Sequence, residues 1–316
     1  MSRTFEAALT GAPVFFEPVP PSLRTRPDRI DAYFEELATR LKSVETLDAI
    51  DVPELIDENH DGRPYYRTAD PRQIGRRLAE RVARTVVVNK VVAHLPSEAA
   101  LVDWTRETLA GGIRHVVLVG GSSRYIPYPG PPVIEADRVC AGILRAQGGH
   151  LGNIAIPQRQ GEAHRMLAKT RAGASFFTTQ ILFDSEGLRR TLREYDALCQ
   201  KAGVPTAAVL LSFAPIADET DAEFVRWLGA DIPEAAERWI LNGDESSAGD
   251  RAIEHARRVW RETRSGANAD GLSLALGINV EQLTQRHLDV ALRMLTELSG
   301  AVTNTRIRDR QHWQYQ

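Results

Sequence analysis

Hydrophobic and polar positions follow two alternating periods along the chain. Short runs rich in apolar and β-branched residues, typical of buried strands, alternate with longer segments in which apolar side chains recur about every three or four residues. The strand-like runs lie at residues 13–17, 47–52, 85–92, 115–119, 153–156, 176–180, 206–212 and 271–276. The helical segments lie at residues 28–44, 71–81, 97–110, 132–147, 162–171, 186–201, 221–229, 233–242, 248–265 and 280–298.

The order of these segments predicts the fold. Strands that alternate with helices form a parallel sheet, and eight such units favour closure into a barrel. We therefore predict an α/β protein in which one domain, residues 1–316, holds a single (βα)8 TIM barrel over about residues 12–298, with extra helices and a short C-terminal tail at 299–316. An open doubly wound sheet is the alternative, but the GxGxxG dinucleotide-binding pattern does not follow any strand.

Two connections are longer than the usual link of about 2–6 residues between a strand and the next helix. One spans residues 53–69 and the other spans residues 120–132, which are rich in Gly, Pro, Ser and Tyr. Both follow predicted strands. In a barrel they would lie at the C-terminal face, where active sites are found.

Composition excludes several classes of protein. The 316 residues are 43% hydrophobic and 26% charged, with a net charge of −3, which is ordinary for a soluble domain with a large core. A basic block that would indicate a nucleic-acid partner is missing. The sequence also lacks an N-terminal signal pattern and an apolar run of about 18 residues. We therefore expect a cytoplasmic protein that is not bound to a membrane.

The residues that most often bind metals show no useful spacing. The two cysteines, Cys140 and Cys199, are far apart, which fits two structural thiols in a reducing compartment. The eight histidines form no HExxH or clustered Cys/His pattern. We expect no metal.

The segment at residues 173–184, Gly-Ala-Ser-Phe-Phe-Thr-Thr-Gln-Ile-Leu-Phe-Asp, carries the strongest functional signal. Its aromatic part suits a buried strand, Gln180 would end that strand, and Asp184 and Ser185 would cap the following helix. Ala-Gly-Ala, then aromatics and Thr-Gln-x-x-Phe-Asp, resembles the methylenetetrahydrofolate reductase family. Residues 15–21 (Phe-Phe-Glu-Pro-Val-Pro-Pro), 112–118, 203–205 and 210–215 agree in order, so the resemblance covers about residues 12–295.

The resemblance implies a (βα)8 barrel that reduces the methylene bridge of a folate to a methyl group, within one-carbon metabolism and methionine biosynthesis. It implies that Glu17 is the proton donor that opens the folate ring. The residue pattern agrees, because a Glu that ends an apolar strand is pushed towards its neutral form. A shift of its pKa from about 4.3 to about 7 costs roughly 3–4 kcal/mol and makes it a general acid.

Three residues are expected to contact the folate, and the resemblance carries the first of them. Gln180 has donors and acceptors on one planar amide and matches the family's contact with the pterin. Thr179 belongs to the same motif. Phe213, which follows the seventh predicted strand, is expected to stack on a flat ring of the substrate or to pack in the core.

Departures from the family pattern concern the cofactor. Flavin-dependent members end the fourth strand in Leu-Arg-Gly-Asp, whereas residues 118–122 read Leu-Val-Gly-Gly-Ser. The Tyr-Pro-Glu-x-His pattern after the fifth strand is replaced by Ile-Pro-Gln-Arg-Gln at residues 156–160, and the Thr-Tyr-Gly-Ala turn after the second strand is replaced by residues 50–54 and the long loop. The chain therefore resembles the flavin-independent branch, in which NADH passes hydride directly to the folate. We expect FAD to be absent.

Candidate residues for NADH follow from the two long loops. Gly120 and Gly121 would allow close backbone approach, and Ser122 would donate hydrogen bonds. Asn59 lies in the first loop, and Arg63 or Arg124 would meet the pyrophosphate. The choice of NADH over NADPH rests on the resemblance.

Three alternatives remain open at this point. The first is a methylenetetrahydrofolate reductase that uses FAD in an altered site. The second is a non-catalytic barrel that binds folate or a partner. The third is a barrel oxidoreductase that acts on a related pterin with a deazaflavin. In each case the sequence fits a monomer or a homodimer.

Overall fold

The computed structural model describes residues 3–59, 61–123, 125–243 and 245–313. Eight parallel strands form a closed barrel in the order β1-β10-β9-β8-β7-β6-β5-β2. The strands are β1 (Val14–Glu17), β2 (Ala49–Val52), β5 (Thr85–Val91), β6 (His115–Val119), β7 (His150–Ala155), β8 (Ala174–Thr179), β9 (Ala208–Phe213) and β10 (Leu276–Glu281). The predicted (βα)8 TIM barrel is confirmed.

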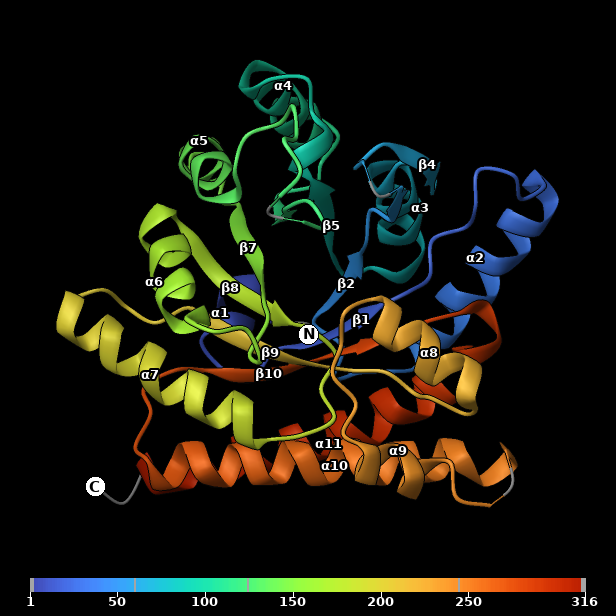
Figure 1. Ribbon diagram of the computed structural model, residues 1–316, viewed down its shortest axis with the longest axis vertical. Helices are drawn as coiled ribbons and strands as arrows, with labels where there is room; N and C mark the ends of the chain where they lie inside the picture. The colour runs from blue at the N-terminus through green and yellow to red at the C-terminus, as the bar shows by residue number, and fades with distance from the viewer. Residues whose placement is uncertain (1–2, 60, 124, 244, 314–316) are drawn as a thin grey trace.

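Helices surround the barrel, as Figure 1 shows. They are α2 (Pro27–Lys42), α3 (Pro71–Val82), α4 (Glu98–Ala110), α5 (Val133–Arg145), α6 (Glu162–Ala172), α7 (Glu186–Ala202), α8 (Glu219–Trp227), α9 (Glu234–Ile240), α10 (Glu245–Ala269) and α11 (Leu288–Trp313). Two short 3-10 turns, η1 (Val92–His94) and η2 (Gln285–His287), follow β5 and β10. The apolar faces of the helices pack on the outer side of the strands and form the larger of two cores.

Local sequence explains several helix boundaries. The Ser97 hydroxyl accepts a hydrogen bond from the Ala100 amide at 3.2 Å and starts α4. Asp70 caps α3, whose first residue is Pro71. At the start of α7, only one of the two expected capping residues, Asp184 and Ser185, caps the helix. The Asp184 carboxylate accepts from the amides of Glu186 and Gly187, while Ser185 makes no side-chain cap.

The second core fills the interior of the barrel near the N-terminal ends of the strands. It contains Phe5, Leu9, Phe15, Ala49, Val87, Val117, Phe176, Ala208 and Leu210. Phe5 belongs to α1 (Phe5–Leu9), a short helix that the sequence pattern does not predict. The Phe176 ring meets those of Phe5 and Phe15 edge-on, with centroids 5.8 and 5.9 Å apart. This aromatic layer makes the lower half of the barrel a packed core.

The alternation of side-chain direction along each strand determines which residues face the interior between the aromatic layer and the C-terminal face. Successive side chains of a strand point to opposite faces, so residues two positions after an interior residue also face the interior. On β1, β2, β5, β8 and β9 these positions are Glu17, Asp51, Asn89, Thr178 and Ser212. The interior therefore changes from apolar to polar on the way to the C-terminal face.

The eighth strand lies later in the chain than the sequence pattern predicts. The prediction at residues 271–276 is wrong, because α10 continues to Ala269 and a turn with Gly271 at φ 64° follows it. The strand is Leu276–Glu281, which pairs with both β1 and β9. The helix predicted from residue 280 begins at Leu288, and α11 continues through the segment predicted as a tail as far as Trp313.

The two long connections differ from each other. Residues 53–69 contain an antiparallel hairpin of β3 (Ile56–Glu58) and β4 (Pro64–Arg67), where the sequence pattern predicts only a loop. Residues 120–132 contain no helix or strand among those described. Both follow the C-terminal ends of strands, as expected.

We expect Phe176→Ala to lower the free energy of unfolding by about 3–5 kcal/mol, because it removes a buried ring from the middle of the interior aromatic layer. Denaturant unfolding followed by circular dichroism measures this loss. Leu23→Ala is the control, since Leu23 is 67% exposed, and it should change the value by less than about 0.5 kcal/mol. Equal effects of the two substitutions would contradict this account of the interior.

Candidate active site

Three acidic side chains lie on neighbouring strands at the C-terminal end of the barrel. Glu17 pairs in register with Glu281 of β10, and the pairing of Phe15 with Ala49 brings Asp51 of β2 to the other side of Glu17. Neighbouring strands are about 4.8 Å apart. We call Glu17, Asp51 and Glu281 the carboxyl cluster.

Glu17, the middle member of the carboxyl cluster, is buried and hydrogen-bonded to Asn279. The amide nitrogen of Asn279 donates a hydrogen bond to Glu17 Oε2 at 2.9 Å and a second one to Ser212 Oγ at 3.2 Å. Burial raises the pKa of Glu17 to about 7, and the hydrogen bond from Asn279 opposes that rise. At neutral pH the carboxyl group is therefore protonated in a large fraction of molecules and can give up its proton.

The other two members of the carboxyl cluster, Asp51 and Glu281, also have raised pKa values. Asp51 is 0% exposed, and neither of its carboxyl oxygens has a hydrogen-bond partner among the described residues. Burial and the nearby Glu17 raise the pKa of Asp51 well above its ordinary value. Burial, Glu17 and Asp51 do the same to Glu281, opposed by a hydrogen bond with Ser212.

The residues expected to bind folate have different surroundings. Gln180 lies just past β8, and both ends of its amide are engaged. Its nitrogen donates to the Leu228 carbonyl and its oxygen accepts from the Ile181 amide, each at 2.9 Å. Thr179 is 3% exposed and its hydroxyl accepts from the Ser212 amide at 2.9 Å, which joins β8 to β9.

Phe213 is the last residue of β9, but its side chain does not face the interior of the barrel. It is 1% exposed and belongs to the core between strands and helices. It follows the inward-facing Ser212 by one residue, so its ring points to the other side of β9. The structure supports its packing role and not the expected stacking on substrate.

Two of the residues expected to bind NADH, Gly121 and Ser122, contact a network that joins the two long connections. Glu58 of β3 accepts hydrogen bonds from Tyr128 at 2.7 Å and Ser122 at 3.1 Å, and its other oxygen lies 2.9 Å from His94 Nε2. These hydrogen bonds lower the pKa of Glu58 against the effect of burial. The Tyr128 ring packs over Gly121, where a Cβ atom would approach the ring to 2.2 Å.

The remaining expected residues lie nearby. A Cβ atom on Gly120 would lie 3.2 Å from Val133. Asn59 shapes the hairpin, because its side-chain oxygen accepts from the amides of Asp61 at 3.0 Å and Arg63 at 2.8 Å. Arg63 is exposed at the turn. Arg124 lies outside the described residues.

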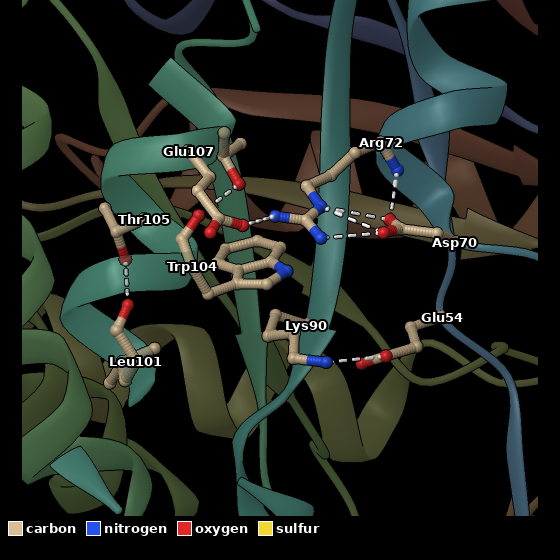
Figure 2. A network of polar contacts seen from close by, with 9 residues as sticks. Glu54, Asp70, Arg72, Lys90, Leu101, Trp104, Thr105 and Glu107 are labelled. Atoms are coloured by element: carbon tan, nitrogen blue, oxygen red, sulfur yellow. Dashed lines mark hydrogen bonds and ion pairs between the residues drawn. The ribbon is translucent and has the colours of Figure 1, made fainter. Parts of the chain in front are cut away.

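A second network of polar contacts lies outside the barrel wall, next to β5 (Figure 2). Glu54, which follows β2, accepts from Lys90 Nζ and from the Val91 amide, each at 2.7 Å. The Trp104 ring lies between Lys90 and Arg72, which are 5.7 and 5.4 Å from its centroid. Lys90 is on the outer face of β5, where its ammonium group pairs with Glu54 and lies over the Trp104 ring. It therefore does not point into the barrel.

The described residues contain no group of three or more His, Cys, Asp or Glu side chains arranged to hold a metal ion. Within the same part of the chain, none of the helices combines the length and apolar character needed to cross a membrane.

Sequence reasoning missed several members of the site. Asn279 and Glu281 were hidden by the misplaced eighth strand, although Leu-Gly-Ile-Asn-Val-Glu alternates and ends in Glu as β1 does. Asp51 lies within residues 50–54, which the sequence marks only as a departure from the flavin pattern. Its position two residues beyond the interior Ala49 is the signal that identifies it.

Fold and site together define a (βα)8-barrel protein with an acidic mouth. Neither a family model nor a curated protein matches the sequence. Among solved structures, the chain is similar to one described as an uncharacterized protein from Clostridium thermocellum that binds two copies of 5-methyl-5,6,7,8-tetrahydrofolic acid. The TM-score is 0.75 at 14% identity, over 92% of this chain and 97% of that one. Identity at this level shows a shared fold.

A second solved structure is described as a putative lyase/mutase from Burkholderia cenocepacia. It has a TM-score of 0.45 at 12% identity and covers 77% of this chain and 96% of that one.

We expect Glu17→Gln to stabilise the protein in a pH-dependent way. The pKa of Glu17 is about 7 in the folded state against an ordinary value of 4.5, so the folded wild type loses stability as pH rises through this window. Relative to wild type, Glu17→Gln should gain roughly 2–3 kcal/mol between about pH 5 and pH 8.

Urea unfolding at the two pH values measures this difference. Glu45→Gln is the control, because Glu45 is exposed. A gain that is the same at both pH values would show that Glu17 does not titrate in this window.

Proposed function

We propose that this protein reduces 5,10-methylenetetrahydrofolate to 5-methyltetrahydrofolate by direct hydride transfer from NADH, without a flavin. The single observation that carries the proposal is Glu17, a carboxyl group at the barrel mouth whose pKa is about 7. Such a group is a proton donor at neutral pH, and ring opening of the folate requires one.

The proposed reaction has two chemical steps. Glu17 first protonates the bridging nitrogen of the folate, which breaks one carbon–nitrogen bond of the five-membered ring and leaves an iminium ion. The C4 hydride of NADH then adds to the iminium carbon, which requires the two carbons to lie about 3–3.5 Å apart. The products are 5-methyltetrahydrofolate and NAD⁺, and a proton from solvent restores Glu17.

Two further observations support the proposal, one for the folate as substrate and one for a reaction without FAD. The structurally similar protein from Clostridium thermocellum is described as binding 5-methyltetrahydrofolate, which is the product of the proposed reaction. In addition, the segments that match flavin contacts in the family are replaced here. One of them supplies Ser122, whose hydroxyl is bonded to Glu58, and this fits a site that works without FAD.

A folate-binding barrel without catalysis is the second candidate. The description of the similar structure mentions binding alone, and the Gln180 amide is already bonded to backbone groups. The two candidates differ in their need for an acid at Glu17, since binding does not require one.

We expect Glu17→Gln to lower the rate of NADH oxidation in the presence of methylenetetrahydrofolate by at least about 100-fold, because the amide cannot protonate the bridging nitrogen. The assay uses purified protein without added flavin, after its visible absorption spectrum has been recorded. Binding of 5-methyltetrahydrofolate should remain within about threefold of wild type, since the amide keeps the shape of the acid.

The outcomes separate the candidates. A colourless wild type that oxidises NADH only with the folate supports direct transfer. A yellow protein, or activity only after FAD is added, would contradict the flavin-free reaction. Folate binding without turnover in the wild type would leave the binding barrel as the function.

A further inference from the structure

Unpartnered acceptor oxygens gather on one side of the barrel mouth. Both carboxyl oxygens of Asp51, Asn89 Oδ1 and Asn279 Oδ1 are buried without a hydrogen-bond partner in the part of the chain that is described. The three residues are 0%, 6% and 0% exposed. They lie on β2, β5 and β10, which with β1 form four consecutive strands, β10-β1-β2-β5. We call Asp51, Asn89 and Asn279 the acceptor arc.

The direction of these side chains follows from the strands. Asp51 and Asn89 come two residues after Ala49 and Val87, which belong to the interior core. Asn279 reaches Glu17 and Ser212 through its amide nitrogen, and this fixes its oxygen as the unpartnered atom. The acceptor arc therefore surrounds Glu17 on both sides.

Among the described residues, no basic side chain forms a hydrogen bond with the unpartnered oxygens of the acceptor arc. Lys90, next to Asn89, is on the outer face of β5 and bonds to Glu54. The helix on the outer side of β2 contributes the apolar side chains Ile74 and Leu78. The acidic neighbours of Asp51 are Glu17 and Glu281. A buried acceptor without a donor costs about 1–3 kcal/mol, so a ligand that brings N–H donors would recover this free energy.

We infer that the acceptor arc is a subsite for a planar ligand edge with several N–H donors, such as the 2-aminopyrimidinone edge of a reduced pterin. In its ionised form, Asp51 accepts from the ring N–H and the amino group of such an edge with its two oxygens, so binding of the ligand favours release of the Asp51 proton, and Asn89 accepts a further N–H. The assignment of the edge to a pterin rests on the proposed function. The need for a donor-rich edge does not.

This assignment moves the recognition of the pterin away from Gln180. The Gln180 amide already has backbone partners at both ends, whereas Asp51 has none. The geometry also suits the reaction, because Asn89 lies two strands from Glu17, or about 10 Å at the usual strand spacing. A pterin held at Asp51 and Asn89 would leave the bridging nitrogen of the folate near Glu17.

The test uses two probes, isocytosine, which carries the 2-aminopyrimidinone edge alone, and 5-methyltetrahydrofolate. Their affinities are measured by ligand-observed NMR and by calorimetry on the full chain. We expect Asp51→Asn and Asn89→Leu each to weaken both probes by about 10-fold or more, because each removes hydrogen bonds to the ligand edge. Gln180→Ala should change the affinity for isocytosine by less than about threefold.

Asp137→Asn is the matched control. Asp137 is also a fully buried carboxyl group with an unpartnered oxygen, and burial raises its pKa to about 7, but it lies on α5 and receives a hydrogen bond from Asn153. It should leave both affinities unchanged. Thermal unfolding of each variant confirms that the protein remains folded, and the two arc variants give independent readings.

Each outcome has one meaning. Isocytosine binding that Asp51→Asn and Asn89→Leu weaken supports the acceptor arc, even if the protein oxidises no NADH. Binding of 5-methyltetrahydrofolate that survives both substitutions and is lost in Gln180→Ala would overturn the acceptor arc and leave the proposed function standing. A wild type that binds neither probe would overturn both.

Discussion

The feature on which the rest of this structure depends is a set of three acids that are buried together, with no basic partner among the described residues. Glu17, Asp51 and Glu281 face one another at the barrel mouth, and each has a raised pKa because burial disfavours its charged form. Holding such groups in place costs free energy that other parts of the fold must offset. A site of this kind is typical of function, since stability alone would favour apolar residues there.

The apolar core at the N-terminal ends of the strands makes the barrel rigid, and the acids at the C-terminal ends depend on this rigidity. Phe5, Phe15 and Phe176 fill the interior directly below the acids, so the strands that carry Glu17 and Asp51 have little freedom to separate. On the outer side, Glu54 and Lys90 hold the ends of β2 and β5 together. Apolar packing from below and ion pairing from outside thus keep the acids close despite their repulsion.

The sequence predicts the barrel well because the fold repeats one local pattern eight times, and an error in one repeat does not change the class. It predicts that Glu17 ends the first strand, because the boundary of that apolar strand is clear. It does not predict Asn279 or Glu281, which meet Glu17 only through closure of β10 on β1. Phe213 illustrates a different limit, since a shift of one residue along a strand reverses the face of the ring.

The two sides of the barrel mouth differ in how completely their buried polar groups are hydrogen-bonded. On the side of β6 and the hairpin, Glu58 is hydrogen-bonded to Ser122, Tyr128 and His94. The polar groups of this side are therefore paired within the protein, and their bonds join the two long connections. On the side of β10, β1, β2 and β5, the oxygens of Asp51, Asn89 and Asn279 that lack a partner receive no hydrogen bond from the described part of the chain. A ligand therefore gains most free energy by turning its N–H groups towards Asp51. Because Glu17 lies within that same set of strands, the ligand recognition and the proton donation that we propose would both depend on one rigid part of the barrel.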